Sequence, residues 1–201
     1  MFEDFFFQNL WVVLPIWLIL YISDYYLTIV AARHYRANEH IEFEVGYELT
    51  PQLQKDINQL RLFSRKFFIW VLITSFAIVY LWWFAKTDKV ASYVYRFVFG
   101  GLILRGLAVW IRHARNISLF RAIAKHQGIS GKIRYAKWLT YQISAAEFLG
   151  YSGVFLIGYI WTGSATFLGG IVCILVTAAK HAWISRRAKQ LVNGGAGAEG
   201  G

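Results

Sequence analysis

The chain has 201 residues, of which 57% are hydrophobic and 18% aromatic, and it carries a formal net charge of +10. The apolar residues are gathered into long runs, whereas a soluble domain disperses a smaller apolar share along its sequence, so a soluble globular protein is excluded. The single Cys173 excludes an internal disulfide. Because the basic residues lie beside apolar runs, we expect them to set membrane orientation and to contact anionic lipid headgroups of the bilayer. Nucleic acid is not expected as a partner.

Five stretches are long and apolar enough to cross a membrane, which takes about 20 mainly apolar residues. They are Asn9–Ala32, Phe67–Ala85, Ser92–Ile111, Trp138–Thr162 and Ala165–Trp183. Only Gly163 and Ser164 separate the last two, which predicts a tight helical hairpin. The sequence therefore predicts an all-α integral membrane protein with one transmembrane domain over residues 1–193. A flexible Gly-rich tail is expected to follow at residues 194–201.

Lysine and arginine residues predict the orientation of these spans, because they are enriched in segments that stay in the cytoplasm. The N-terminal tail has neither and carries Glu3 and Asp4, and the loop after the second span has only Lys86 and Lys89. The remaining basic residues outside the spans gather in the other connecting segments and the C-terminal tail: Arg33, Arg36, Lys55, Arg61, Arg65, Lys66, Arg112, Arg115, Arg121, Lys125, Lys132, Arg134, Lys137, Arg186, Arg187 and Lys189. We therefore expect the N-terminus outside and the C-terminus in the cytoplasm.

Three charged side chains lie well inside the predicted spans, namely Asp24, Arg105 and Glu147. At the helical rise of 1.5 Å per residue, each lies about 10 to 13 Å from the cytoplasmic end of its span, so they share one layer. We expect an ionic triad there, with Thr28 and Ser144 within reach as hydrogen-bond partners. Two interpretations stay open. The triad is either a buried ion network that fixes helix register or a site that binds or relays an ion, a proton or a polar substrate.

Small residues mark places where helices can approach closely. Ala146, Gly150 and Gly153 are spaced by four and three residues in the fourth span, which predicts a stripe for close helix packing. The pairs Gly100-Gly101 and Gly169-Gly170 occupy similar places in the third and fifth spans.

The segment between the first two spans is too polar to cross a membrane, yet it is patterned. Residues 40–45 alternate apolar and acidic side chains, which predicts a strand. Thr50-Pro51 then predicts the cap and first position of a short cytoplasmic helix that ends at about Phe63. The third span is expected to continue as a helix through Asn116, Leu119 and Phe120 to about His126, and Gly128 is expected to break it. Residues 132–135 also alternate, now with basic side chains, so a two-strand ribbon is expected in which Glu42 and Glu44 pair with Lys132 and Arg134. The candidate interaction residues of this cytoplasmic face are Glu42, Glu44, Glu48, Lys132 and Arg134.

The sequence carries no motif for a known chemistry: it has no nucleophile elbow, P-loop, dinucleotide fingerprint or zinc-ligand spacing. His34, His40 and the neighbouring acids could approach a metal ion, but their spacing matches no ligand motif. A solvated or salt-bridged face is the favoured interpretation. We therefore expect no catalytic residue, no metal and no cofactor.

Three short motifs resemble a group of uncharacterised bacterial multi-pass membrane proteins. They are Asp24-Tyr25-Tyr26-Leu27-Thr28, Glu48-Leu49-Thr50-Pro51 and Arg112-His113-Ala114-Arg115-Asn116-Ile117. In that group an Asp-x-x-Leu-Thr span precedes a Glu-x-Asn-Pro-like helix start, and here Thr50 stands where Asn is usual. The resemblance implies a bacterial inner (plasma) membrane setting and implies no activity.

Taken together, these features predict a non-catalytic subunit or assembly and interaction protein of a membrane complex. Its partners would be other membrane subunits or further copies of itself, and its basic cytoplasmic face would be the docking surface. The alternative is a small oligomeric transporter or channel for an ion, proton or solute that uses Asp24, Arg105 and Glu147. A membrane enzyme acting on lipid through His34, His40 or Glu48 is a third and less favoured interpretation.

Overall fold

The computed structural model describes the backbone of residues 2–44, 51–126 and 129–196 and the side chains of residues 5–44, 53–125 and 129–191. Seven helices and two strands follow one another in this part of the chain. They are α1 (Phe2–Gln8), α2 (Leu10–Arg36), β1 (Ile41–Phe43), α3 (Pro51–Asn58), α4 (Arg65–Phe84), α5 (Lys89–His126), β2 (Ile133–Tyr135), α6 (Lys137–Thr162) and α7 (Ala165–Ala196).

Five of the helices, α2, α4, α5, α6 and α7, are long and apolar enough to cross a membrane. Many of their large apolar side chains point outward, and Trp11 and Trp161 are 86% and 89% exposed. Such outward apolar surface fits a lipid environment and not water. The five predicted spans are therefore confirmed in length and composition as those of a multi-pass membrane protein.

The helices differ strongly in length. The 20 residues of α4 correspond to about 30 Å, which is the thickness of a bilayer's hydrocarbon core. The 38 residues of α5 correspond to about 57 Å, so this helix runs far past any single membrane crossing. The expected continuation of the third span as a helix to about His126 is confirmed. The span bounds set by hydropathy missed only the polar helical turns that lengthen α2 and α7.

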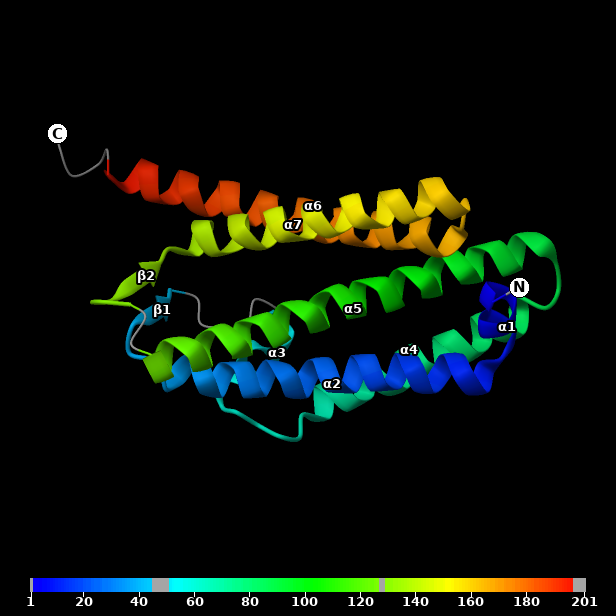
Figure 1. Ribbon diagram of the computed structural model, residues 1–201, viewed down its shortest axis with the longest axis horizontal. Coiled ribbons are helices and arrows are strands. Elements are labelled where there is room, and N and C mark those ends of the chain that lie inside the picture. The colour runs from blue at the N-terminus through cyan, green and yellow to red at the C-terminus, as the bar shows by residue number, and fades with distance from the viewer. Residues whose placement is uncertain (1, 45–50, 127–128, 197–201) are drawn as a thin grey trace.

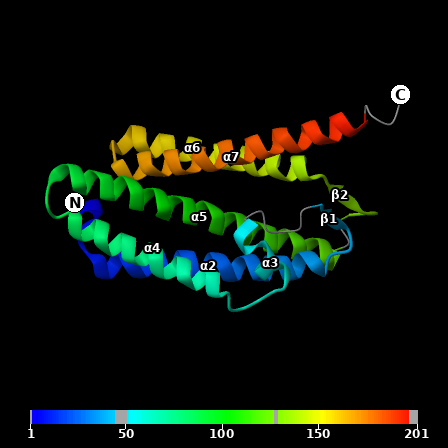
Figure 2. The same cartoon turned by 180° about the vertical axis from the view of Figure 1, so that it is seen from behind.

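The long helix α5 lies at the centre of the molecule, between α2 on one side and the α6–α7 hairpin on the other (Figure 1). Seen from behind, α4 lies beside α2 and covers only part of its length (Figure 2). The strands and the end of α7 lie at one end of the bundle, α3 lies between this end and the start of α4, and α1 and the α4–α5 connection lie at the other end (Figure 1). We call the first the ribbon end and the second the α1 end.

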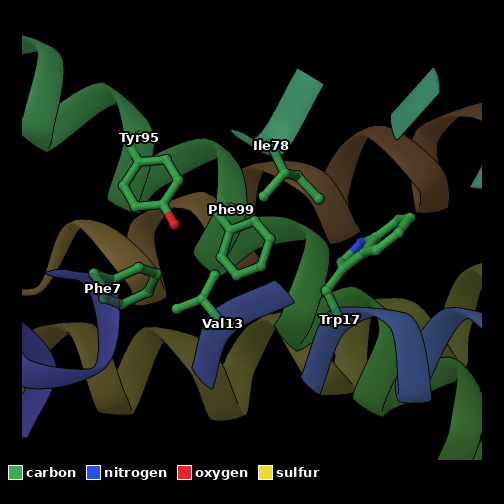
Figure 3. Packing of buried hydrophobic residues seen from close by; sticks show 6 residues of the cluster. All are labelled: Phe7, Val13, Trp17, Ile78, Tyr95 and Phe99. Carbon is green, nitrogen blue, oxygen red and sulfur yellow. The ribbon is translucent and has the colours of Figure 1, made fainter. Parts of the chain in front are cut away.

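The α1 end of the bundle is filled by apolar and aromatic side chains (Figure 3). Phe7 from α1 meets Val13 and Trp17 from α2, Ile78 from α4, and Tyr95 and Phe99 from α5. The rings of Tyr95 and Phe99 stack with centroids 5.7 Å apart, and Phe7 stands edge-on to both. This core joins α1, α2, α4 and α5.

Glycines allow α5 and α7 to cross closely. A Cβ atom added to Gly100 would lie 2.6 Å from the Thr166 backbone, and one added to Gly101 would lie 2.8 Å from the Gly169 carbonyl oxygen. A Cβ on Gly169 would in turn overlap the carbonyl oxygen of Phe97. Only glycine fits such backbone contacts.

The small-residue stripe expected on α6 does not pack in this way. A Cβ atom added to Gly150 or Gly153 would meet no atom of the described chain within 4 Å, and Ala146 is exposed on the same face. The prediction of close packing at this stripe was therefore wrong within the chain. The tight hairpin turns the opposite face of α6 inward, where Phe148 and Phe155 are buried against α5 and α7.

The two short strands pair in parallel, with Ile41 opposite Ile133, Glu42 opposite Arg134 and Phe43 opposite Tyr135. Both strands follow helices that run toward the ribbon end, α2 and α5 (Figure 1). Below the ribbon, Ile41 packs with Phe120 and Ile123 of α5. The strand pair thus joins the polar ends of α2 and α5, which extend past the start of α4.

Two expected boundaries changed. Helix α3 begins at Pro51, but it ends at Asn58 and not near Phe63, because Leu60 takes a left-handed backbone conformation with φ 51°. The expected cap Thr50 lies outside the described residues. Helix α7 continues to Ala196, so residues 194–196 of the expected tail are helical, and residues 197–201 lie outside the described part.

Candidate functional site

The polar layer of the molecule lies at the level where α4 begins. The ring of Tyr25 stacks on Phe67, in the first turn of α4, with centroids 4.3 Å apart. Its hydroxyl group donates a hydrogen bond of 2.7 Å to the carbonyl oxygen of Arg61, just before α4. Asp24 precedes Tyr25 in α2 and therefore lies at the same level of the bundle as the start of α4. A membrane fitted to the length of α4 would have one boundary at this layer.

Asp24 of α2 faces His113 of α5. Nε2 of His113 lies 3.2 Å from Oδ1 of Asp24 and 3.1 Å from the hydroxyl oxygen of Thr28. The Thr28 hydroxyl donates to the carbonyl oxygen of Asp24 at 2.8 Å, so its lone pairs are left to accept from the imidazole. His113 is only 4% exposed. The contact to Oδ1 is close, but its angles are not those of a hydrogen bond, and this buried oxygen accepts none.

On the other side of α5, Glu147 of α6 pairs with Arg115. Nη1 of Arg115 lies 2.6 Å from Oε1 of Glu147, and Nε and Nη2 of the same guanidinium donate to Asn116. One turn earlier, Arg112 donates to the hydroxyl oxygen of Ser144 at 2.7 Å. The same oxygen lies 2.9 Å from Nδ1 of His181 in α7. Arg112, His113 and Arg115, within one turn of α5, therefore connect to α2 and α6, and Ser144 extends this network to α7.

The three charged residues expected to form a triad do not form one ionic cluster. Asp24 and Glu147 take their partners from α5, but these partners are His113 and Arg115. Arg105 forms no ion pair or hydrogen bond within the described chain. The reason is the length of α5, whose polar turns beyond Ile111 continue as helix and bring basic residues level with the two acids.

Two cavities lie on either side of this stretch of α5. The central cavity, of about 100 Å³, lies between α2, α5 and α7, and its polar lining includes Asp24, Thr28, Arg105, Arg112, His113 and His181. The ribbon cavity, of about 200 Å³, lies between α5, α6 and the strands, and its lining includes Arg112, Arg115, Glu147, Ser144, Phe43 and Tyr135. Arg112 and His113 line both cavities. Ser144 and Glu147 thus face a different space from Asp24 and Arg105.

At the ribbon, Glu42 and Lys132 form an ion pair with 2.8 Å between Oε2 and Nζ. The hydrogen bond and the charge of Lys132 lower the pKa of Glu42 below its ordinary value of 4.5. Arg134 lies opposite Glu42 in the strand register and lowers that pKa further. The acidic and basic strands therefore meet with complementary charge.

Glu44 has a different role from the expected one. Its Oε2 accepts a hydrogen bond of 2.7 Å from the backbone N–H of Lys137, the first residue of α6. The cap position of α6 is Ala136, whose side chain cannot accept a hydrogen bond. Glu44, just after β1, therefore caps α6, and within the described part of the chain it makes no ion pair with Lys132 or Arg134. Glu48 lies outside that part of the chain.

The two histidines considered for an enzyme contact different partners. His34 accepts a hydrogen bond from Nε of Arg121 at 3.0 Å, and Nδ1 of His40 lies 2.8 Å from the carbonyl oxygen of Gly131. No group of three or more His, Cys, Asp or Glu side chains that could hold a metal ion is found among the described residues.

Sequence reasoning missed Arg112, His113, Arg115 and His181 as parts of the polar layer. The first three lay beyond the predicted end of the third span, in a motif that carried only a family resemblance. The spacing of Arg112 and Arg115 by three residues was a usable signal, because such residues share one helix face. Nothing in the sequence pointed His181 toward Ser144.

Comparison with known proteins found no match to any protein-family model, any curated protein or any solved structure.

Proposed function

We propose that the protein is a non-catalytic component of a bacterial inner-membrane complex, a subunit or assembly factor that binds its partners at the ribbon end. The N-terminus then lies outside and the ribbon end lies in the cytoplasm. The observation that carries the proposal is the platform built at this end. It consists of the strand pair, α3 and the ends of α2, α5, α6 and α7 that continue past the start of α4.

The platform is held together well enough to present a fixed surface. The strand pair packs on Phe120 and Ile123, Glu44 caps α6, and Ser185 of α7 donates to the carbonyl oxygen of Trp138 in α6. Its outer surface is basic, with Arg121, Lys125, Lys132, Arg134 and Lys137 among the exposed side chains. A rigid surface with an excess of positive charge is suited to an acidic protein partner and to anionic lipid headgroups.

The packing at the α1 end argues against a route through one copy of the chain. Phe7, Val13, Trp17, Tyr95 and Phe99 fill the space between α1, α2 and α5 there, and each is nearly inaccessible. Both polar cavities lie toward the ribbon end. A single copy is therefore better suited to binding at one membrane face than to conduction.

The test is to extract the protein gently from its native membrane and to determine the mass and composition of the particle. Wild type is expected to come out with other membrane proteins. Lys125→Glu with Arg134→Glu, which reverse two charges of the platform, should release these partners. Lys89→Glu reverses a charge at the α1 end and serves as the matched control. Recovery of the wild type as a monomer or homo-oligomer alone would argue against a complex subunit.

A second candidate is a small oligomeric transporter for an ion, proton or solute. It is favoured by the central cavity, where Asp24, Arg105 and two histidines converge. In this case Asp24→Asn should abolish flux across liposomes while the protein still folds and inserts. Under the first proposal wild type gives no flux above empty liposomes.

A further inference from the structure

The central cavity is enclosed by side chains from all five long helices and from α3. Leu53 and Ile57 of α3, Phe67 of α4 and Phe148 of α6 form its apolar walls, and α2, α5 and α7 supply the polar groups. Its volume of about 100 Å³ leaves room for a small ligand only. Convergence of polar groups from several helices in such a space is the usual arrangement of a binding site.

Positive charge dominates this cavity. Arg105 and Arg112 are seven residues apart on one face of α5, about 10.5 Å along the helix axis. Neither guanidinium pairs with a carboxylate among the described residues: Arg112 donates to Ser144 and lies over the ring of Phe148, and Arg105 has no such partner. The acid that lines the cavity is Asp24, which faces His113. Partly buried cations without a counter-ion are costly, so an anion in this space would be stabilised.

Asp24 restricts the kind of anion. Its Oδ1 atom is buried and accepts no hydrogen bond in the described chain. A carboxylate oxygen repels an anion unless a hydrogen atom lies between them. The ligand that satisfies both the arginines and Asp24 is therefore an oxyanion that still carries a proton. Phosphate meets this condition near neutral pH, whereas sulfate and chloride carry no proton there.

We propose that the central cavity binds a phosphate group, with Arg105 and Arg112 donating to its oxygens and Asp24 accepting from its protonated oxygen. Guanidinium groups are well suited to phosphate because their N–H groups match its oxygens in a fixed fork. The phosphate is either free inorganic phosphate or the monoester headgroup of a lipid such as phosphatidic acid. The phosphate group of a diester headgroup carries no proton that it could donate to Asp24. The proposal is independent of the docking role of the ribbon end.

The first test compares inorganic phosphate with sulfate by titration calorimetry on the purified full-length protein at matched ionic strength. Wild type is expected to bind phosphate at least about tenfold more tightly than sulfate, because sulfate leaves the repulsion with Asp24 in place. Asp24→Asn replaces the acceptor by an amide that can donate, so the two anions should then bind about equally. Equal binding of both anions by wild type would overturn the proposal.

The second test removes one guanidinium at a time. Arg105→Gln should weaken phosphate binding about tenfold to a hundredfold, the usual effect of losing a charged hydrogen bond. This variant removes no hydrogen bond or ion pair of the described structure, so it is expected to fold even if Asp24→Asn does not. Arg115→Gln is the matched control, because Arg115 lines the ribbon cavity and not the central one. Equal loss of affinity in both variants would contradict the assignment.

The two sources of phosphate are separated by competition. Protein in nanodiscs of phosphatidylcholine with phosphatidic acid should no longer bind inorganic phosphate if the lipid headgroup occupies the cavity. Nanodiscs with phosphatidylglycerol, whose phosphate is a diester, serve as the control, because their surface is also negatively charged. Unchanged phosphate binding in both kinds of nanodisc assigns the cavity to free phosphate.

Discussion

At the scale of single residues, the contacts of each polar side chain depend on which helix turn faces it. Asp24 and Glu147 were recognisable in the sequence because a charge inside an apolar run is costly and needs a partner. Their partners were not, because His113 and Arg115 lie beyond the apolar part of α5, and the helix pattern alone does not show which residues of its polar continuation face the two acids. The ribbon was easier to predict. Acidic residues such as Glu42 alternate with apolar ones in one segment, and basic residues alternate in the other, so the pattern indicates both the strands and their pairing.

The Glu42–Lys132 pair gives a prediction at this scale. Lys132 holds the pKa of Glu42 below its ordinary value of 4.5, so the charged carboxylate is more stable in the folded protein than in the unfolded chain. The contribution of the pair to ribbon stability is therefore present above the unfolded pKa and lost as pH falls through the lowered folded pKa. In Lys132→Met the Glu42 carboxyl should titrate at a higher pH than in wild type, as followed by carboxyl chemical shifts in NMR. Lys125→Met, which also removes one lysine charge, should leave the Glu42 titration unchanged.

At the scale of helices, the sequence predicted how many long apolar elements there are but not which faces they pack. A span is visible as a run of apolar residues, and all five runs became helices. Small residues at three- and four-residue spacing mark a face that can pack closely, yet the spacing does not say whether a neighbour covers it. Gly169 is covered by the backbone of α5, and the similar stripe at Gly150 and Gly153 is open.

This contrast predicts opposite effects for one kind of substitution. Gly169→Ala should destabilise the protein by about 1–3 kcal/mol, because the new methyl group meets the carbonyl oxygen of Phe97 and the backbone of α5 must shift. Gly150→Ala and Gly153→Ala should be neutral or stabilising by up to about 1 kcal/mol, because alanine is the better helix former and nothing blocks its methyl group. Thermal unfolding midpoints in one detergent compare the three variants. Similar losses at Gly150 and Gly169 would contradict the crossing of α5 and α7.

At the scale of the whole molecule, the uneven helix lengths and the uneven charge distribution point to one orientation. Helix α4 is about as long as a bilayer core is thick, and the other long helices continue past its start only toward the ribbon end. That end also carries most of the lysines and arginines outside the apolar runs, which remain in the cytoplasm during insertion. The helix lengths show which end extends past α4, and the charges favour the proposal that this end lies in the cytoplasm.

Cysteine labelling checks this orientation. The chain has one cysteine, Cys173, so Cys173→Ser gives a background without thiols. In that background Lys89→Cys, at the start of α5, should react with a membrane-impermeant maleimide added to intact cells. Lys132→Cys, beside β2, should react only after the membrane is permeabilised. Both side chains are exposed in the structure, so a difference between them reports the membrane and not burial. If Lys132→Cys were labelled in intact cells and Lys89→Cys were protected, the bundle would be inserted the other way round, and the basic platform would face outward.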